Sequence, residues 1–564
     1  MNSVKESRES QRKELYTIGL DYGTLSARAI LVDIGTGEVM AEAVKEYAHG
    51  VLDTELPDGT PVPFDWAFQH PGDYLDALYT IVPQVVRESG IAPEKIIGIS
   101  ADFTGCTLIS LDKNGTPLCF LPEYEKELFA WVALWKHHGA VEYAPIVHRA
   151  VEEQMPEMLA RHGGKISCEC VMPRALQMLR EAPKIFEAAD LIMEAGDWLL
   201  MQLTGKLVRS QSMAGFKAFW KEGRGYPDNT FYTALDEKLR DYDRTKQRGE
   251  IKAIGDCSGR LTDEMAAKLG LRPGIAVGVA LYDAHAAVAG CGVSELGTVA
   301  LSVGTSGGFL VCSDRLVPVE GTTGATMSGY LPGWYGYATG QVSLGDSFAW
   351  FVKNMVPERY HSEAREKGMS VHTLLTEKAA NYAPGETGLL ALDWWGGNRS
   401  ILVNAELSGL MLGMTLQTKP EEMYRAMLES VAFGSRSIME SYERAGLHVE
   451  KIHAVGGIAK KNSLLMQIYA DILNRPIYIC KSTQAAALGA AMFAASAAGE
   501  ETGGYATVQE AVKRMANLED YHYEPIPEHV AVYQKLYEEF ERLHDYFGRG
   551  ENEVMKRLRR GKVQ

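Results

Sequence analysis

The hydrophobic pattern at the start of the chain predicts two buried strands joined by a tight turn. Residues 16–22 and 27–32 are mostly apolar, and the small residues Gly23, Thr24 and Ser26 lie between them. Short apolar runs bounded by small residues are typical of buried strands. So little side-chain bulk lets backbone N–H groups and hydroxyls approach phosphate oxygens closely. The pattern predicts a phosphate-binding hairpin, with an ordinary Gly-Thr turn as the alternative.

The same pattern returns in the middle of the chain, where residues 299–311 form two apolar runs around Gly304 and Thr305. Two hairpins of one kind predict two related halves that grip one nucleotide, although each hairpin alone would favour an ordinary turn. A P-loop is excluded, because no Gly-Lys pair is followed by Ser or Thr. A nucleophile elbow is excluded at residues 304–308, because the chain continues there as a strand rather than a helix.

The remaining pattern predicts an α/β protein. Strands are expected at residues 96–102, 108–112, 271–281, 451–455 and 476–480, and helices at residues 420–445, 463–473 and 484–498. Residues 121–245 are expected to be more helical and irregular, as an insertion that builds a substrate pocket. The chain after residue 504 is expected to be helical and charged. This order implies a mostly parallel or mixed sheet covered by helices.

Length and charge narrow the class of protein. A chain of 564 residues is long for one core, so we expect a polar tail at 1–14, an N-terminal domain at 15–292 and a C-terminal domain at 293–564. The net charge of −16 argues against a nucleic-acid-binding surface. The eight cysteines are scattered, the first residues lack the apolar segment of a signal peptide, and residues 485–499 are too short to span a bilayer. We therefore expect a cytoplasmic protein without membrane or nucleic-acid partners.

Two charged residues flank the first turn. Asp21 ends the first apolar run and could hold Mg²⁺ through water, since Mg²⁺ keeps several of its waters. Arg28 adds a fixed positive charge. Further along, Asp283 lies between a strand and an alanine-rich segment, where it either caps a helix or serves as a general base. Both roles can hold at once. The nearby His285 is expected to be structural.

Three other groups are candidates for ligand contacts. Asp102, Phe103 and Thr104 end a buried strand and suit the recognition of hydroxyl groups. Lys217 lies among aromatic residues, where a surface lysine is the alternative. The third group links a buried strand to a helix and permits close approach of a flat or anionic ligand, with a tight turn as the alternative. It consists of Gly456, Gly457 and Asn462.

Together these motifs resemble the FGGY family of carbohydrate kinases, and within it the bacterial ribulokinase branch. The resemblance covers about residues 16–548. Branch-specific stretches are residues 68–71, 134–136, 163–167, 283–285 and 392–400. The resemblance implies an α/β fold of two actin-like (ribonuclease H-like) ATPase domains around a central cleft. It also implies phosphorylation of a ketopentose by ATP and Mg²⁺, with L-ribulose giving L-ribulose 5-phosphate.

The resemblance also assigns roles to residues. Asp283 matches the catalytic base and Lys217 a sugar-contacting lysine. The phosphate motifs match Asp21, Thr24, Ser26 and Arg28 in the first hairpin, and Gly304 and Thr305 in the second. Gly456, Gly457 and Asn462 lie in the adenosine motif. The expected partners are a small-molecule sugar and ATP, with a homodimer as a possible assembly.

Three positions depart from the ribulokinase pattern. Ala338 stands where a sugar-contacting glutamate is typical, Leu25 where a polar residue is typical, and Cys170 where an aromatic residue is typical. The departures keep a kinase for another ketose or a polyol as an alternative. A sugar-sensing protein without activity and an Hsp70-like ATPase are alternatives of another class, although the helices expected after residue 500 do not suit the peptide-binding domain of an Hsp70.

Overall fold

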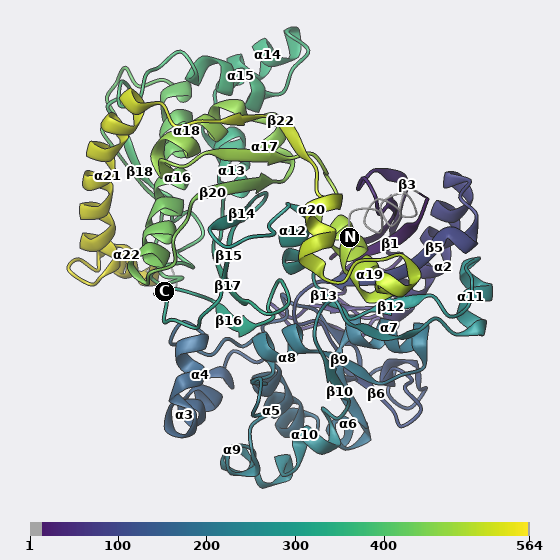
Figure 1. Cartoon of the computed structure of the whole chain (residues 1–564). Helices are drawn as coiled ribbons and strands as arrows, with labels where there is room; N and C mark the ends of the chain where they lie inside the picture. Colours follow the sequence, from purple (N-terminus) through teal and green to yellow (C-terminus); the bar gives the residue numbers. More distant parts are fainter. Residues whose placement is uncertain (1–13, 562–564) are drawn as a thin grey trace.

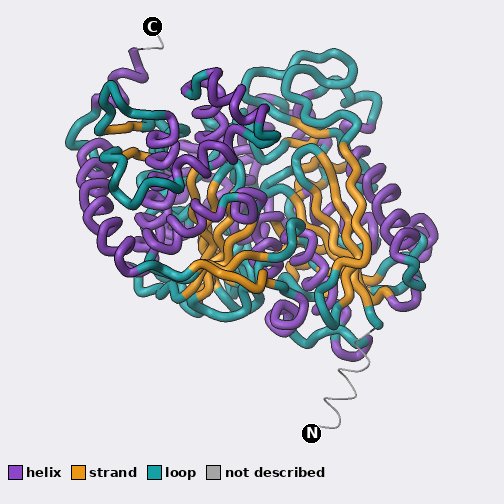
Figure 2. Tube along the Cα trace, turned by 90° about the horizontal axis from the view of Figure 1, so that it is seen from above, coloured by secondary structure: helices purple, strands orange, loops and turns teal. Residues whose placement is uncertain are grey.

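The computed structural model of the protein describes residues 14–561, and it contains two large β-sheets (Figure 2). The first sheet comprises β1 (Tyr16–Tyr22), β2 (Ser26–Asp33), β3 (Val39–Glu46), β5 (Ile96–Phe103), β11 (Cys257–Arg260), β12 (Ala276–Gly278) and β13 (Leu281–Tyr282). The second comprises β14 (Thr298–Val303), β15 (Gly307–Ser313), β16 (Gly324–Met327), β17 (Tyr335–Gln341), β20 (Lys451–Val455), β21 (Ile477–Cys480) and β22 (Leu518–Tyr523).

The two sheets repeat one strand order. In the first, β3, β2 and β1 form an antiparallel meander, and β5 and β12 follow beside β1 in parallel. In the second, β17, β15 and β14 form the meander, and β20 and β21 follow beside β14 in parallel. One Gly-Thr turn joins β1 to β2, and the other joins β14 to β15. In each sheet the strand before the turn, β1 or β14, also pairs with a parallel strand. The related halves expected from the two hairpins are therefore present.

Helices cover both sheets and a third, smaller unit. The longer ones are α2 (Pro71–Ser89), α3 (Ala144–Gln154), α5 (Val171–Glu181), α7 (Ala195–Thr204), α13 (Gly345–Met355), α16 (Pro420–Arg444), α18 (Ser463–Leu473), α19 (Ala485–Ala498) and α21 (Pro527–Gly548). The expected irregular region, residues 121–245, shares a hydrophobic core and a four-stranded sheet with residues 52–119. That sheet contains β4 (Phe68–Gln69), β7 (Val132–Ala133), β6 (Leu108–Leu111) and β8 (Leu191–Glu194). None of the described helices is long and apolar enough to cross a membrane.

The alanine-rich helix α19 lies on the first sheet although it is far along the chain (Figure 1). It contacts β1 and β5 and crosses α12 (Asp283–Gly290). Glycines make this approach possible: a Cβ at Gly19 would lie 1.9 Å from the Ala487 carbonyl oxygen, and one at Gly489 would lie 1.9 Å from the Ala286 carbonyl oxygen. Thr17 Oγ1 donates to the Ala491 carbonyl oxygen at 2.9 Å. The expectation of a closely packed core helix is confirmed.

The C-terminal segment differs from expectation at one place. Residues after 504 were expected to be helical, but Leu518–Tyr523 form β22, which pairs antiparallel with β21 at the edge of the second sheet. Its acidic and polar side chains are exposed, as suits an edge strand. The helical expectation failed because a short polar segment carries little periodicity, and only pairing with β21 makes it a strand.

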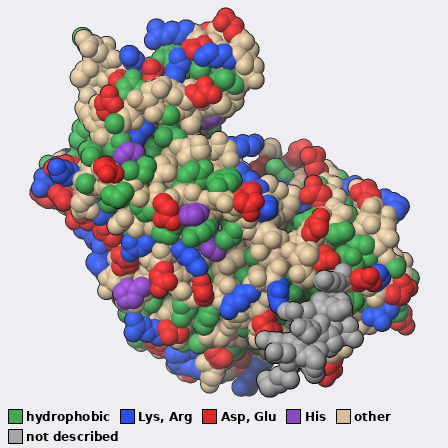
Figure 3. Space-filling model, turned by 45° about the horizontal axis from the view of Figure 1, so that its top comes forward, with side chains coloured by type: hydrophobic (Ala, Val, Ile, Leu, Met, Phe, Trp, Pro, Cys, Tyr) green, Lys and Arg blue, Asp and Glu red, His purple; other side chains and the backbone are tan. Residues whose placement is uncertain are grey.

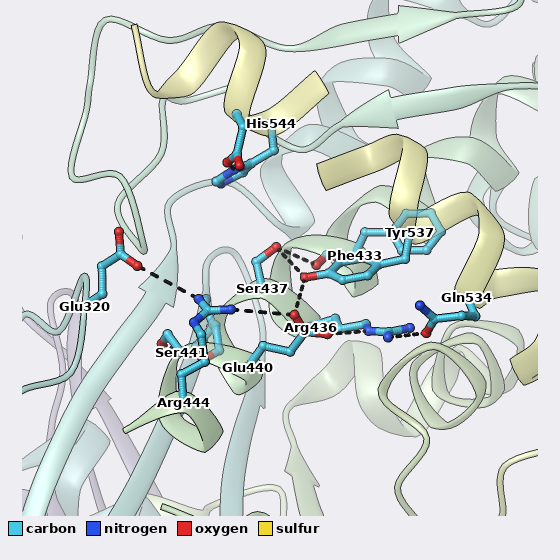
Figure 4. Close-up of polar contacts among 12 residues, drawn as sticks. Glu320, Phe433, Arg436, Ser437, Glu440, Ser441, Arg444, Gln534, Tyr537 and His544 are labelled. Carbon is cyan, nitrogen blue, oxygen red and sulfur yellow. Dashed lines mark hydrogen bonds and ion pairs between the residues drawn. The ribbon is translucent and has the colours of Figure 1, made fainter. Parts of the chain in front are cut away.

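Polar contacts attach α21 to α16 (Figure 4). Tyr537 Oη donates to Glu440 Oε2 at 3.2 Å and lies 3.2 Å from Ser437 Oγ. The Arg436 guanidinium lies 4.1 Å above the Tyr537 ring and donates to Glu440 Oε1 at 3.0 Å. These contacts, with the buried face of α21, make the C-terminal helix part of the second core. On the face drawn in Figure 3, acidic and basic side chains are interspersed.

Candidate active site

Three aspartates meet at the carboxyl ends of neighbouring strands of the first sheet. Asp21 ends β1, Asp102 lies opposite it on β5, and Asp283 follows β13, which also pairs with β5. Because β1, β5 and β13 run parallel, their carboxyl ends lie at one edge, where ligands bind in open α/β sheets. Asp21 and Asp102 are 81 positions apart in the sequence, and Asp283 is farther still from either. The sheet, not the local sequence, therefore brings the three residues together.

Asp102 is fully buried, and neither carboxylate oxygen has a hydrogen-bond partner among the described residues. Burial raises the pKa of this carboxyl well above its ordinary value, and the carboxylates of Asp21 and Asp283 add to the shift. A buried polar group without a partner is costly. It marks a place where a bound cation would satisfy the free oxygens.

Asp21 is also buried, and its Oδ2 accepts a hydrogen bond from Arg28 Nη1 at 2.8 Å. Hard divalent cations such as Mg²⁺ prefer carboxylate and water oxygens. The oxygen donors of Asp21 and Asp102 therefore fit such an ion. The Arg28 side chain remains 37% exposed to solvent while it pairs with this carboxylate.

Asp283 is the first residue of α12, and its Oδ1 accepts from the Ala284 backbone N–H at 2.6 Å. The N-cap residue of α12 is Tyr282, so Asp283 lies inside the first turn and accepts from an N–H of that turn rather than capping the helix. Burial raises the pKa of this carboxyl to about 7, and the Asp21 carboxylate contributes to the rise. A base with a pKa near the working pH is suited to accept a proton from a hydroxyl group.

Lys217 ends α8 (Gln211–Lys217) and forms an ion pair that the sequence did not reveal. Its Nζ lies 2.9 Å from Glu169 Oε2, and both side chains are largely enclosed. Burial raises the pKa of Glu169, but the Lys217 ammonium outweighs burial and holds it at about 2. Burial lowers the pKa of Lys217, but Glu169 outweighs this and raises it above its ordinary value. The two residues are 48 positions apart, and no sequence pattern links them.

Glu194 is a second residue that sequence reasoning missed. It ends β8, and its Oε1 accepts from Tyr282 Oη at 2.7 Å, next to Asp283. Burial raises the pKa of this carboxyl to about 8. His285 is enclosed by the rings of Phe216 and Tyr330, and burial lowers its pKa to about 3. The environment of His285 suits the structural role expected for it.

Phe103 and Thr104 are buried and contact neighbouring side chains of the protein. The Phe103 ring stacks on Tyr22 with ring centroids 4.9 Å apart and is 1% exposed. Thr104 Oγ1 lies 2.7 Å from Thr107 Oγ1, and both are buried. These contacts give the two residues a packing role beside Asp102.

The first phosphate turn is closed by a hydrogen bond from Gly23 N to the Ser26 carbonyl oxygen at 3.0 Å. Thr24 carries two anchors: its carbonyl oxygen accepts from Gln69 Nε2 at 2.8 Å, and its Oγ1 accepts from Trp135 Nε1 at 3.1 Å. The turn is thus held at both its backbone and its side chain. Leu25 at its tip is 61% exposed.

The second turn is closed by Gly304 N donating to the Ser306 carbonyl oxygen at 3.2 Å. The Thr305 carbonyl oxygen accepts from Leu344 N at 3.0 Å, which ties the turn to the start of α13. Gly345 packs against it, since a Cβ there would lie 2.7 Å from the Gly304 carbonyl oxygen. The turn occupies the same place in the second sheet as the first turn does in its own.

The Gly-Gly pair follows β20 at the carboxyl edge of the second sheet. Gly456 has φ 115°, and a Cβ there would lie 2.4 Å from the Val303 carbonyl oxygen, so the residue must be small. Gly457 faces open space, with nothing within 4 Å of a Cβ. Asn462 Oδ1 accepts from Leu465 N at 2.9 Å and caps α18. Gly457 is therefore the position of this motif that is free for a ligand.

Ala338 lies on β17, opposite Leu310 of β15 and Gly324 of β16. Gly324 packs on Phe216, next to Lys217, since a Cβ there would lie 2.7 Å from the Phe216 ring. Ala338 is half-buried beside this cluster. Cys170 is buried at the start of α5. The departures at 338 and 170 therefore lie on different elements, β17 and the start of α5.

Comparisons with known proteins agree with this architecture. The N-terminal domain of the FGGY family of carbohydrate kinases matches residues 16–290, and the C-terminal domain of the same family matches residues 299–498. A ribulokinase of Halalkalibacterium halodurans is 50% identical over 96% of this chain and 97% of that protein. A ribulokinase of Geobacillus thermodenitrificans is 48% identical over 97% of both chains.

Solved structures with the same fold include a xylulose kinase from Lactobacillus acidophilus, with a TM-score of 0.77, 21% identity, and coverage of 94% of this chain and 98% of the other. A gluconate kinase from the same organism has a TM-score of 0.76, 22% identity, and coverage of 95% and 98%. Both sequence identities are low, so these structures support the fold alone: a two-domain α/β protein with actin-like architecture. With both family domains matched in order along its length, the chain belongs to the FGGY family of carbohydrate kinases.

Proposed function

We propose that this chain transfers the γ-phosphoryl group of Mg²⁺-ATP to the terminal hydroxyl of a ketopentose, converting L-ribulose to L-ribulose 5-phosphate. Membership of the kinase family supports ATP as the phosphoryl donor. The names of relatives at 48–50% identity over nearly the whole chain support L-ribulose as the acceptor. Such a kinase would act in arabinose catabolism in the cytoplasm.

The observation that carries the proposal is the position of Asp283. It is a carboxylate with a pKa of about 7, at the edge of a sheet, beside two further carboxylates and a phosphate-type turn. Phosphoryl transfer needs positioning and charge stabilisation more than covalent chemistry. Asp283 accepts the proton of the attacking hydroxyl, and Lys217 holds the sugar.

The nucleotide lies between the two Gly-Thr turns in this proposal. The N–H groups and hydroxyls of Thr24, Ser26 and Thr305 contact phosphate oxygens, and the open side of Gly457 receives the adenosine. Asp21, with Asp102 beside it, would hold Mg²⁺, which would supply positive charge to neutralise the phosphoryl oxygens. Arg28 holds the Asp21 carboxylate in place through their 2.8 Å ion pair.

A second candidate substrate class follows from Ala338. A carboxylate is absent at this position, which lies beside the Lys217 region, so another ketose or a polyol is the alternative acceptor. The test is a coupled ADP-release assay with ketopentoses, ketohexoses and polyols. The proposal predicts the highest kcat/KM with L-ribulose, and a higher value for any other sugar would shift the assignment to that sugar. ADP release that no sugar stimulates would refute the kinase assignment.

A further inference from the structure

The ion pair between Lys217 and Glu169 lies in a largely enclosed part of the protein. Lys217 Nζ and Glu169 Oε2 are 2.9 Å apart, and the two side chains are 20% and 31% exposed. A partly buried ion pair loses hydration of both charges, so it needs good geometry to persist. The Glu169 backbone is fixed as well, because its carbonyl oxygen accepts from Cys106 Sγ and its N–H donates to Ser167 Oγ at 3.2 Å.

Arg174, another cationic residue near Glu169 in the N-terminal half, donates its hydrogen bonds to backbone carbonyl oxygens. Arg174 donates its Nη1 to the Cys106 carbonyl oxygen at 2.8 Å and its Nη2 to the carbonyl oxygens of Leu134 and His137 at 3.0 and 3.1 Å. It therefore holds loops together and makes no ion pair with Glu169. Lys217 is the only ion-pair partner of Glu169 among the described residues.

A second cation approaches Glu169 from the C-terminal half. Arg399 contributes to the lowered pKa of Glu169, its side chain is exposed, and it makes no hydrogen bond or ion pair within the described chain. Its neighbour Ser400 fixes the loop: Ser400 Oγ donates to the Gly321 carbonyl oxygen at 2.8 Å and accepts from Gly340 N at 3.2 Å.

The two segments meet near these residues. A Cβ at Gly163, six residues before Glu169, would lie 1.8 Å from the Thr322 carbonyl oxygen, and one at Gly321 would lie 2.4 Å from Ile401 Cα. The loop that carries Arg399 and the segment that leads to Glu169 thus pack on the same two residues, 321 and 322. This shared contact brings Arg399 of the C-terminal half close enough to lower the pKa of the Glu169 carboxyl of the N-terminal half.

We propose that Glu169 is a positioning residue for Lys217, and that Arg399 reaches this pair from the C-terminal half when the two halves close on their substrates. The inference rests on the proposed function, in which Lys217 contacts the sugar. One ammonium hydrogen of Lys217 is directed to Glu169, and two remain for sugar hydroxyls. Glu169 therefore decides where Lys217 points, and Arg399 balances the carboxylate charge as water leaves.

Several titratable groups face Lys217 and bear on its charge. They are Glu169, Glu194, His285, Cys106 and Cys170. Without the Glu169 carboxylate, burial and the remaining groups act alone on the ammonium. Burial lowers the pKa of Lys217, so the variant Glu169→Gln should lose sugar affinity as the pH rises from 7 to 9, whereas the unaltered protein should not.

The experiment measures KM for the sugar, KM for ATP and kcat at several pH values. For Glu169→Gln we expect a rise of about tenfold to a hundredfold in the sugar KM, the range of one hydrogen bond to a charged group, with the ATP KM unchanged. Glu169→Asp should recover part of the loss. Glu157→Gln is the matched control, because Glu157 also lies 2.9 Å from its partner, Arg224, on an exposed surface.

Two double-mutant cycles separate positioning from simple destabilisation. In the background of Lys217→Met, Glu169→Gln should add little to the sugar KM, because the partner is gone. Arg399→Met should raise the sugar KM and couple to Glu169→Gln, but not to Glu157→Gln. Glu169→Gln with an unchanged sugar KM would overturn the inference while leaving the kinase assignment in place. An unaltered protein that phosphorylates no sugar would overturn both.

Discussion

Asp21 and Asp102 lie directly opposite each other on the parallel strands β1 and β5, and among the described residues only Asp21 of the two has an ion-pair partner. Two carboxylates in one enclosed site resist double ionisation, so one of them takes up a proton or a cation. Asp283 lies beside the same pair, at the start of the helix α12 that follows β13. The relationship brings the proposed metal-binding carboxylates and the candidate base to a single sheet edge, beside the first Gly-Thr turn.

The buried carboxyl of Asp102 should make the protein without ligands less stable as the pH rises. Its pKa in the folded protein is raised above that of the unfolded chain, so the folded state binds more protons and stability falls as the pH rises above the unfolded value of about 4. Asp102→Asn removes this loss. Thermal unfolding should show a gain in Tm for the variant that is larger at pH 8 than at pH 5.

Asp58→Asn is the control for this pH dependence. Asp58 is exposed, and its hydrogen bonds with Thr60 lower its pKa, the opposite direction. It should show no gain at pH 8. A Tm difference for Asp102→Asn that does not depend on pH would contradict a raised pKa. Addition of Mg²⁺-ATP should stabilise the unaltered protein more than the Asn variant.

Asp283→Asn should lower kcat by about 10²–10⁴-fold, the usual contribution of a general base, with the ATP dissociation constant nearly unchanged. The unaltered protein needs the ionised carboxylate, whose pKa is about 7, so its kcat/KM for the sugar should rise with pH through this value. The measurement is a pH–rate profile between pH 5.5 and 8.5. Asp263→Asn, also at the first position of a helix, is the matched control. A variant with near-normal turnover would show that Asp283 is not the base.

Gly489→Ala should destabilise the protein and reduce its activity together. The added Cβ would lie 1.9 Å from the Ala286 backbone oxygen, so α12 and α19 must separate, and α12 carries Asp283. Overpacking of a core typically costs about 1–3 kcal/mol, and a backbone atom yields less than a side chain does. Urea unfolding measures the loss.

Gly457→Ala serves as the comparison for the previous change. Nothing lies within 4 Å of a Cβ at Gly457, so its unfolding free energy should match that of the unaltered protein. If the open side of Gly457 receives adenosine, Gly457→Leu should raise the ATP dissociation constant without a loss of stability. Equal effects of the substitutions at 457 and 489 on urea unfolding would contradict the packing argument.

Ala338→Glu should change the sugar preference. A carboxylate on β17 beside the Phe216–Lys217 region would accept hydrogen bonds from sugar hydroxyls, each worth about 1.5–3 kcal/mol with a charged partner. We expect at least a tenfold fall in the KM for L-ribulose and a narrower range of accepted sugars. The sugar panel used for the unaltered protein is the measurement. A native enzyme that is already exclusive for L-ribulose, with no gain from the glutamate, would show that position 338 does not govern selectivity.

The sequence by itself determined the repeated hairpins, the order of strands and helices and most of their bounds. It did so because apolar runs and Gly-Thr turns are local signals: the helices expected at residues 463–473 and 484–498 are α18 and α19 to within one residue. Segments without such a local signal were not predicted correctly from the sequence. The strand β22 depends on pairing with β21, and the strand expected at 271–281 is divided into β12 and β13.

Only the tertiary structure decided which charges share a site. Asp21, Asp102 and Asp283 are distant along the chain, and the parallel register of β1, β5 and β13 brings them to one edge. Glu169 becomes a candidate site residue only through its ion pair with Lys217, which is 48 positions away and lies in a different segment of the fold. Burial then set the charges, raising the pKa of Asp283 to about 7. Pair contacts and desolvation are properties of the folded chain, so no local pattern of residues contains them.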